Sequence, residues 1–161
     1  FAQPNDGLHI DLSIDFASPV IGKQKHSLVK KQNFRDEIAD SRTFGFLHEL
    51  EYLQSKGLAK GASLDNAIGI DKDVILNHDG LRHDNEFVRH KMLDAFGDLA
   101  LAGAPILGKY EGHKAGHFIT NSLLRKLFAK TDTYVVEDCC EEIFSVLPGS
   151  GVNLEEFTAV A

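Results

Sequence analysis

The sequence lacks a basic excess, a long apolar run and a cysteine framework, and each absence excludes a class of protein. Its 17 lysines and arginines are outnumbered by 24 aspartates and glutamates, so the formal net charge at pH 7 is −7. Nucleic-acid-binding domains need a basic surface, and we therefore expect no nucleic-acid partner. No apolar run approaches the roughly 20 residues of a membrane-spanning helix, and no signal peptide precedes the first strand pattern. We therefore expect no membrane span.

The cysteines and the first residue bear on the origin of the chain. Cys139 and Cys140 are adjacent and have no C-x-x-C spacing, which is not typical of a disulfide framework. We therefore expect a reducing, cytoplasmic location. The chain begins at Phe1 without a methionine, so we expect a fragment or a processed piece of a longer protein. Its 161 residues, 43% of them hydrophobic, are enough for one domain with a sizeable core.

The apolar pattern predicts strands and helices along the whole chain. Residues 7–16, GLHIDLSIDF, alternate without interruption and predict a half-buried strand, with 25–31 as its antiparallel partner. Further strands are expected at 66–77 (two short strands around a charged turn), 105–113 and 131–140. Helices are expected at 34–38 after a cap at Asn33, at 47–57, at 86–99 after a cap at Asp84 or Asn85, and at 117–130.

The order of these elements predicts an α+β fold. We expect a two-layer sandwich in which helices pack on one face of a mostly antiparallel sheet. The segment 45–82 is predicted to be a small β-α-β insertion. No repeat, low-complexity segment or linker divides the chain, so we expect a single domain spanning 1–161.

The predicted helix at 86–99, EFVRHKMLDAFGDL, carries the pattern with the most chemical content. His90, Asp94 and Asp98 recur every four residues and therefore lie along one side of a helix, with Lys91 beside them. The opposite side is apolar and consists of Val88, Met92, Phe96 and Leu99. An imidazole and a carboxylate at this spacing can bind one divalent metal such as zinc or iron, and a surface hydrogen bond between them is the simpler interpretation.

The motif GHKAGH, residues 112–117, supplies further candidates. His113 and His117 are also four residues apart, and Asp98 could hydrogen-bond one of them and fix its tautomer or charge. From the spacing alone, either histidine could be a third metal ligand. Lys114 could contact a phosphate, although a loop lysine is more often simply solvated.

Three motifs in this order resemble one family: RTFGF (42–46), GLRHDNEFVRHKMLDAFGDL (80–99) and GHKAGH (112–117). They are similar to the C-terminal half of the UDP-3-O-acyl-N-acetylglucosamine deacetylases, zinc amidases of lipid A biosynthesis in Gram-negative bacteria. The resemblance extends from the first long strand to about Lys130. It implies a cytoplasmic, monomeric enzyme that removes the N-acetyl group of UDP-3-O-(3-hydroxyacyl)-N-acetylglucosamine and releases acetate, the committed step of the pathway.

The resemblance also implies roles for individual residues. His90 and Asp94 would be two zinc ligands, with ferrous iron as the other metal to consider. His117 would be the charged histidine that stabilises the oxyanion and protonates the leaving amine, Asp98 would hold it, and Thr43 would lie beside the oxyanion. The substrate would contact Lys91, Lys114, Phe44 and Phe46.

Part of the family's active site has no match in this chain. The third zinc ligand and the general-base glutamate of the family lie in a preceding N-terminal domain, and His113 has no family role. We therefore expect residues 1–161 to be the second, C-terminal domain, inactive alone and partnered by an N-terminal domain of the same enzyme. The 45–82 insertion would supply a hydrophobic passage for the acyl chain. Two other hypotheses stay open: an isolated, non-catalytic metal- or acyl-binding module, and a structural domain with a polar helix face.

Overall fold

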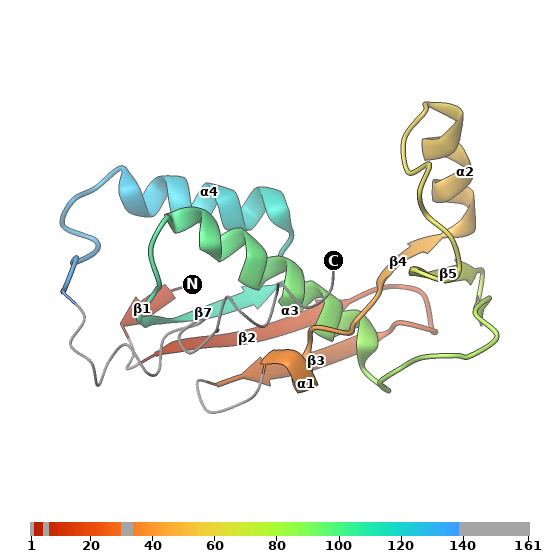
Figure 1. Cartoon of the computed structure of the whole chain (residues 1–161), viewed down its shortest axis with the longest axis horizontal. Helices are drawn as coiled ribbons and strands as arrows, with labels where there is room; N and C mark the ends of the chain where they lie inside the picture. Colours follow the sequence, from red (N-terminus) through yellow and green to blue (C-terminus); the bar gives the residue numbers. More distant parts are fainter. Residues whose placement is uncertain (1, 5–6, 30–33, 139–161) are drawn as a thin grey trace, which may run out of the picture.

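A four-stranded sheet forms the base of the molecule. The computed structural model describes residues 2–4, 7–29 and 34–138 (Figure 1). The sheet has the strand order β1-β7-β2-β3, and a second, three-stranded sheet has the order β4-β5-β6. The strands of the first sheet are β1 (Ala2–Pro4), β2 (Leu8–Asp15), β3 (Lys23–Leu28) and β7 (Gly108–His113). The predicted α+β class is confirmed.

The pairing within this sheet is mixed. β2 and β3 form the predicted antiparallel hairpin, and β1 pairs antiparallel with β7. The central pair, β2 and β7, is parallel. Two of the three pairings are therefore antiparallel, as expected, and the parallel pair arises because a long crossover connects β2 to β7. That crossover contains α3 (Glu86–Leu99).

The core lies between β2 and α3. The alternation of β2 buries Ile10, Leu12 and Ile14 on one face, and α3 contributes its predicted apolar side. Val88 and Met92 of that side are fully buried. α4 (His117–Phe128) lies beside α3 on the same face of the sheet (Figure 1). The polar stripe of α3 is thus held on a rigid, well-packed element.

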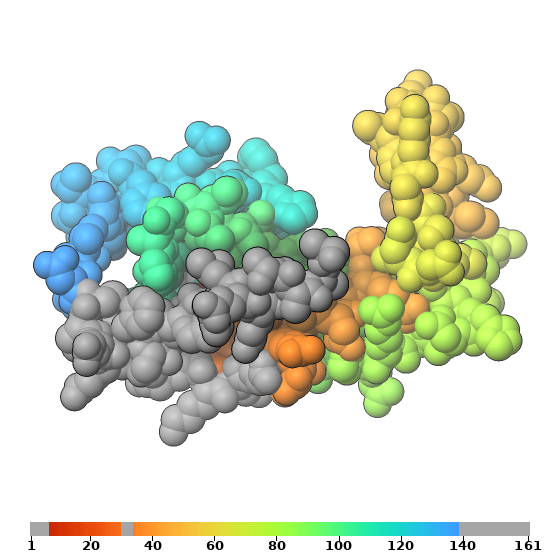
Figure 2. All heavy atoms as spheres, in the orientation of Figure 1, coloured from red at the N-terminus to blue at the C-terminus, as the bar shows by residue number. Residues whose placement is uncertain are grey.

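The second sheet forms the predicted β-α-β insertion. β4 (Thr43–Phe46) pairs parallel with β5 (Ala67–Asp71), and α2 (Leu47–Ser55) connects them. β6 (Val74–Ile75) pairs antiparallel with β5 after the expected charged turn. α2 stands away from α4 at one end of the molecule (Figures 1 and 2).

The ends of the remaining helices follow the predicted positions. α1 (Phe34–Glu37) is the short helix expected at 34–38, and its predicted cap at Asn33 lies outside the described residues. α3 begins after Asn85, as predicted, but the Asn85 side chain makes no capping hydrogen bond and instead accepts one from Arg89 Nε. α3 continues into the 3-10 helix Ala100–Ala102, which ends at Gly103. Gly103 has φ +79°, a conformation that glycine adopts without strain.

The predicted strand at 131–140 is wrong over the part of it that the structure describes. Residues 134–138 form no strand, and Val135 and Val136 are 81% and 84% exposed. Alternating β-branched residues form a strand only beside a strand that can accept their backbone hydrogen bonds. Cys139 and Cys140 lie outside the described residues.

Candidate active site

α3 presents its polar residues as one continuous stripe. Glu86, His90, Asp94 and Asp98 follow one another at intervals of four residues, and none of them is fully exposed. The side chains of His90 and Asp94 are only 13% and 17% exposed. The stripe is therefore largely shielded from solvent.

The geometry of His90 and Asp94 suits a shared metal ion. His90 Nε2 lies 3.3 Å from Asp94 Oδ1. Ligand atoms about 2.0–2.1 Å from a tetrahedral zinc ion are separated from each other by about 3.3–3.4 Å. The donor set also fits, because zinc accepts one imidazole nitrogen and one carboxylate oxygen together.

The surroundings of His90 favour its neutral, metal-binding form. Burial lowers the pKa of His90 below 6.5, and the positive charges of Lys91 and His117 act in the same direction. The Asp94 carboxylate and the Ser41 carbonyl oppose this shift without cancelling it. His90 Nδ1 lies 3.3 Å from the Ser41 carbonyl oxygen, which can only accept a hydrogen bond. Nδ1 therefore carries the hydrogen, and Nε2 has a free lone pair beside Asp94.

Lys91 lies against the same carboxylate and an aromatic ring. Its Nζ is 2.9 Å from Asp94 Oδ2 and 5.6 Å from the centre of the Phe44 ring. The Phe44 ring also packs edge-on against His90 and Phe87, at centroid distances of 6.1 and 5.0 Å. The structure thus brings Lys91 and Phe44 to the His90–Asp94 pair.

A second histidine–aspartate pair lies at the far end of the stripe. His117 Nδ1 is 3.0 Å from both carboxylate oxygens of Asp98, and it opens α4 after the extended backbone of Gly116. The His117 side chain is 66% exposed, whereas that of Asp98 is 11% exposed. A largely buried carboxylate therefore orients a ring whose other nitrogen is open to a ligand. The interaction between Asp98 and one histidine of GHKAGH was predicted, and the structure selects His117.

Other predicted residues lie elsewhere. Lys114 Nζ forms an ion pair with Asp15 at 3.0 Å, and His113 Nδ1 bonds Ser13 Oγ at 2.8 Å. Both partners belong to the face of β2 opposite Ile10, Leu12 and Ile14, so these side chains lie away from α3. Neither is brought to the stripe, and the substrate contact of Lys114 stays a prediction.

The two remaining predicted residues belong to β4. Thr43 is exposed at the start of the strand, directly after the segment that contacts His90. Phe46 stacks on His48 at a centroid distance of 5.7 Å.

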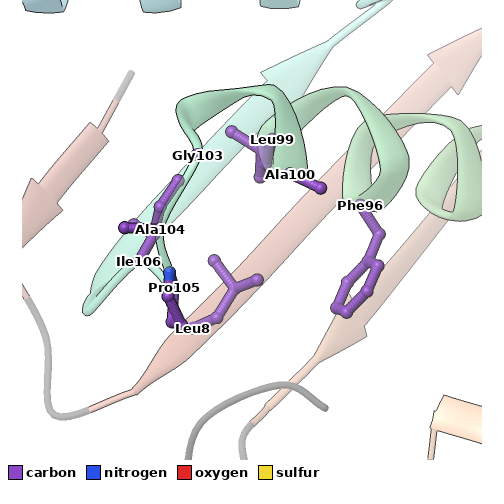
Figure 3. Close-up of a pocket in the computed structure, with 8 residues that line it drawn as sticks. All are labelled: Leu8, Phe96, Leu99, Ala100, Gly103, Ala104, Pro105 and Ile106. Carbon is purple, nitrogen blue, oxygen red and sulfur yellow. The ribbon is translucent and has the colours of Figure 1, made fainter.

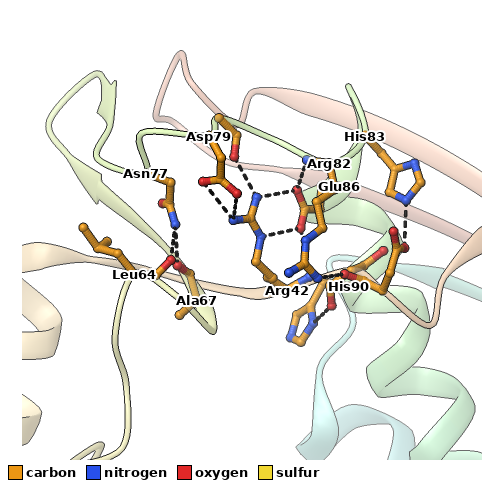
Figure 4. Close-up of polar contacts among 12 residues, drawn as sticks. Arg42, Leu64, Ala67, Asn77, Asp79, Arg82, His83, Glu86 and His90 are labelled. Carbon is orange, nitrogen blue, oxygen red and sulfur yellow. Dashed lines mark hydrogen bonds and ion pairs between the residues drawn. The ribbon is translucent and has the colours of Figure 1, made fainter.

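One pair of residues that the sequence analysis did not single out ties β4 to α3. Glu86 is fully buried, and its Oε1 accepts hydrogen bonds from Arg42 N at 2.9 Å and Arg42 Nε at 3.0 Å (Figure 4). Burial raises the pKa of Glu86, but the bonds from Arg42 and from the Arg82 backbone N–H outweigh burial and lower it. The sequence contained a signal for Glu86, because this residue lies four positions before His90 and so extends the spacing of His90, Asp94 and Asp98.

An apolar cavity of about 410 Å³ lies at the other end of α3 (Figure 3). The described residues that line it are all apolar or glycine: Leu8, Phe96, Leu99, Ala100, Gly103, Ala104, Pro105 and Ile106. None of these residues has a side chain that could take part in hydrolysis.

Within the described part of the chain, no cluster of three or more histidine, cysteine, aspartate or glutamate side chains is arranged to bind a metal. Neither His113 nor His117 joins His90 and Asp94 there, although the spacing alone had left both open. Among the same residues, no helix combines the length and apolarity needed to cross a bilayer.

An α+β chain with a partly buried His–Asp pair and a separate Asp–His pair has side chains of the kind that hydrolases use for acid–base catalysis. Sequence comparison gives the particular family. The UDP-3-O-acyl N-acetylglycosamine deacetylase family matches residues 1–129, and the chain belongs to this family. It is 52% identical over 135 residues to the UDP-3-O-acyl-N-acetylglucosamine deacetylase of a Nitratiruptor species, covering 83% of this chain and 45% of that protein.

Two further relatives carry the same name. The deacetylase of Phenylobacterium zucineum is 49% identical over 142 residues, covering 88% of this chain and 48% of the relative. That of Oleidesulfovibrio alaskensis is 50% identical over 135 residues, covering 83% of this chain and 44% of the relative. The chain thus spans about half the length of the curated relatives it matches.

Proposed function

We propose that the complete protein containing this chain is a zinc-dependent deacetylase. It would hydrolyse the N-acetyl group of UDP-3-O-(3-hydroxyacyl)-N-acetylglucosamine, release acetate and leave a free amine on the glucosamine. The observation that carries the proposal is the pair of His–Asp contacts along α3 in a chain about half identical to named deacetylases. The reaction would belong to lipid A biosynthesis in the cytoplasm of a Gram-negative bacterium.

His90 and Asp94 would hold the metal through Nε2 and Oδ1. When bound, zinc or ferrous iron supplies Lewis acidity, which activates water and polarises the acetamide carbonyl. The contacts of this chain support that role, since burial lowers the pKa of His90, which favours the neutral ring, and the Ser41 carbonyl accepts from its Nδ1–H. The Lys91 ammonium fixes the second oxygen of Asp94, so the carboxylate presents only one oxygen to the ion.

His117 would act on the other side of the scissile amide. Asp98 holds its Nδ1, so Nε2 would point a proton toward the substrate. From there it would stabilise the developing oxyanion and then protonate the departing amine. Thr43, exposed at the start of β4, would supply a hydroxyl to the same oxyanion.

The remaining predicted residues would bind the substrate. Lys91 and Phe44 already lie at the proposed metal ligands, and Phe46 follows on the same strand. Lys114 would contact the diphosphate after leaving Asp15. The 45–82 insertion carries α2 away from the core and would form the passage for the acyl chain (Figure 1).

The chain would be the second domain of a monomeric, two-domain enzyme. Within the described residues no third candidate ligand joins His90 and Asp94, and the matched relatives are about twice as long as this chain. The third ligand and the general base would come from an N-terminal domain, and this chain alone would be inactive.

The test is turnover by the complete protein. Acetate and free amine would be measured with UDP-3-O-acyl-N-acetylglucosamine as substrate, for the wild type, His117→Ala and the matched control His113→Ala. We expect loss of turnover in His117→Ala only, because His113 lies with Ser13 on the other face of the sheet. Binding of the substrate without release of acetate by the wild type would favour the non-catalytic acyl-binding module instead.

A further inference from the structure

We propose that Arg42 and Glu86 are positioning residues of the active site. Their buried ion pair sets the segment Ser41–Thr43 against α3, and through that segment it orients His90 and places Thr43. The inference rests on the proposed function for the roles of His90 and Thr43, whereas the contacts themselves are properties of this chain.

The pair satisfies the buried Glu86 carboxylate at both oxygens. Oε1 accepts from Arg42 N and Arg42 Nε, and Oε2 accepts from Arg42 Nη2 at 3.2 Å and from the Arg82 backbone N–H at 2.6 Å. Side-chain exposure is 0% for Glu86 and 3% for Arg42. A carboxylate bonded on both oxygens by a planar guanidinium and two backbone amides has one orientation only.

The same pair fixes the backbone on which Thr43 and the His90 partner lie. The bond from Arg42 N anchors the main chain itself, between Ser41 and Thr43. The Ser41 carbonyl accepts the hydrogen bond from His90 Nδ1. His90 lies one helical turn after Glu86 on α3. The segment Ser41–Thr43 is therefore held by two contacts with successive turns of α3. The first is the ion pair of Arg42 with Glu86, and the second is the hydrogen bond of Ser41 with His90.

Arg42 also joins the two ends of the insertion. Its Nη2 donates to the Gly80 carbonyl at 2.7 Å, and its Nη1 lies 3.2 Å from Asp79 Oδ2 (Figure 4). Residues 79 and 80 follow β6, whereas Arg42 precedes β4. The Arg42 guanidinium therefore connects the two ends of the β-α-β unit to Glu86 on α3. Displacing it would move Thr43 relative to His90 while leaving both side chains present.

A buried ion pair is weak evidence for stability alone, because the desolvation of both charges offsets their attraction. The fixed orientation of the Arg42–Glu86 pair is better explained by its effect on residues 41–43, which it holds in place against α3. Glu86→Gln keeps the size of the side chain but replaces one accepting oxygen with a donor, which opposes a donor of Arg42 or Arg82. We therefore expect the segment to shift without loss of the fold.

The decisive readout is the tautomer of His90, which does not depend on activity. In the metal-free complete protein at pH 8, nitrogen-15 shifts of the imidazole should show hydrogen on Nδ1 in the wild type and increased Nε2–H in Glu86→Gln. In the metal-loaded protein we expect Glu86→Gln to lower kcat or the affinity for zinc by about 10–100-fold, which is the usual effect of removing a group that orients a metal ligand. KM should change less than kcat, because Thr43 acts on the oxyanion.

The matched control is Glu37→Gln. Glu37 on α1 pairs with Arg89 on α3 at 2.9 Å, so this variant weakens a second carboxylate–arginine pair of the same helix, one that includes neither Arg42 nor Glu86. We expect it to lower stability while leaving the His90 tautomer and kcat unchanged.

Equal behaviour of Glu86→Gln and Glu37→Gln in both readouts would overturn the proposal. If Glu86→Gln does not fold, Arg42→Lys replaces it, because it retains the charge but loses the guanidinium fork. If neither variant folds while Glu37→Gln does, the pair is an anchor of the fold and the positioning role is wrong. Absence of acetate release by the wild type would refute the proposed function, and the tautomer comparison would still decide the inference.

Discussion

At the scale of single residues, His90 is the group whose environment says most about function. Burial lowers its pKa, and its two ring nitrogens have different neighbours, a carbonyl at Nδ1 and a carboxylate at Nε2. A surface histidine that merely bonded Asp94 would not need a second partner that fixes its tautomer. This arrangement supports the proposal that His90 is a metal ligand and that the Ser41 carbonyl orients it.

His90→Ala should abolish stoichiometric zinc binding by the complete protein. The substitution removes one of the three proposed protein ligands, and Asp94 with the ligand of the N-terminal domain would bind the ion weakly. Zinc content after dialysis against a chelator measures the effect. The control is His113→Ala, which should retain its zinc, and zinc retention by His90→Ala would show that the ion is held elsewhere.

Asp98→Asn should lower kcat of the complete protein by about 10²-fold or more, the size of a general acid–base contribution. Asparagine keeps the shape of the side chain but removes the negative charge beside His117. Steady-state kinetics measures the loss, and urea unfolding monitored by circular dichroism checks that the variant is folded. Wild-type turnover in a folded Asp98→Asn protein would remove His117 and Asp98 from the mechanism.

At the scale of elements, the sequence predicts best where the pattern is local. The alternation of apolar and polar residues in 7–16 predicted β2. The four-residue spacing of polar and of apolar residues in 86–99 predicted the polar stripe and the buried side of α3. The hairpin β5–β6 followed from two short apolar runs around a charged turn. Each of these depends on interactions between residues that are close in the chain.

The sequence predicts least where the partner is distant or missing. Arg42 and Glu86 are separated by 44 residues, and although the four-residue spacing of α3 extends to Glu86, no local pattern identifies Arg42 as its partner. The parallel pairing of β2 with β7 also depends on a crossover of many residues. The pattern at 131–138 has the β-branched residues of a strand, but Val135 and Val136 remain exposed without a neighbouring strand in the described structure.

Gly112→Ala should destabilise the junction between β7 and α4. An added Cβ would collide with the Leu12 side chain and come within 3.1 Å of Tyr110, and both of these residues are buried. Overpacking of this kind costs about 1–3 kcal/mol in the free energy of unfolding. Urea unfolding of the chain measures the change, with Gly97→Ala as a control, because a Cβ at Gly97 meets no atom within 4 Å. Equal midpoints for the two variants would show that Leu12 moves aside freely.

At the scale of the whole molecule, stability should decrease as the pH falls below about 6.5. Burial lowers the pKa of His26, the charge of Arg89 adds to this, and Glu37 opposes it only in part. The unfolded chain therefore binds a proton near the ordinary value of 6.5 while the folded chain does not, so protonation favours unfolding. The contribution of His26 is complete above pH 6.5 and is lost as the pH approaches the lower, folded-state pKa.

Urea midpoints at pH 7.5 and pH 5.5 measure this dependence. The difference between the two pH values should be smaller in His26→Gln than in the wild type, because the variant has no imidazole at this position. An unchanged difference would show that His26 titrates alike in the folded and unfolded chains.

The whole chain fits the proposal that it supplies half of an active site. It carries the His90–Asp94 pair on α3 and the Asp98–His117 pair between α3 and α4, and it spans about half the length of its matched relatives. The insertion and α3 are joined by a buried ion pair. We therefore expect a second set of groups, from the proposed N-terminal domain, to face α3.

The most direct test is the zinc affinity of the 161-residue chain alone, compared with that of the complete protein. Competition with a chelator and elemental analysis would be applied to both, after circular dichroism has shown that each is folded. We expect stoichiometric zinc in the complete protein and weak or no binding by the chain alone, since two donors do not hold zinc tightly. Tight, stoichiometric zinc in the chain alone, lost in His90→Ala, would contradict the proposal of a divided site and place a third ligand among these 161 residues.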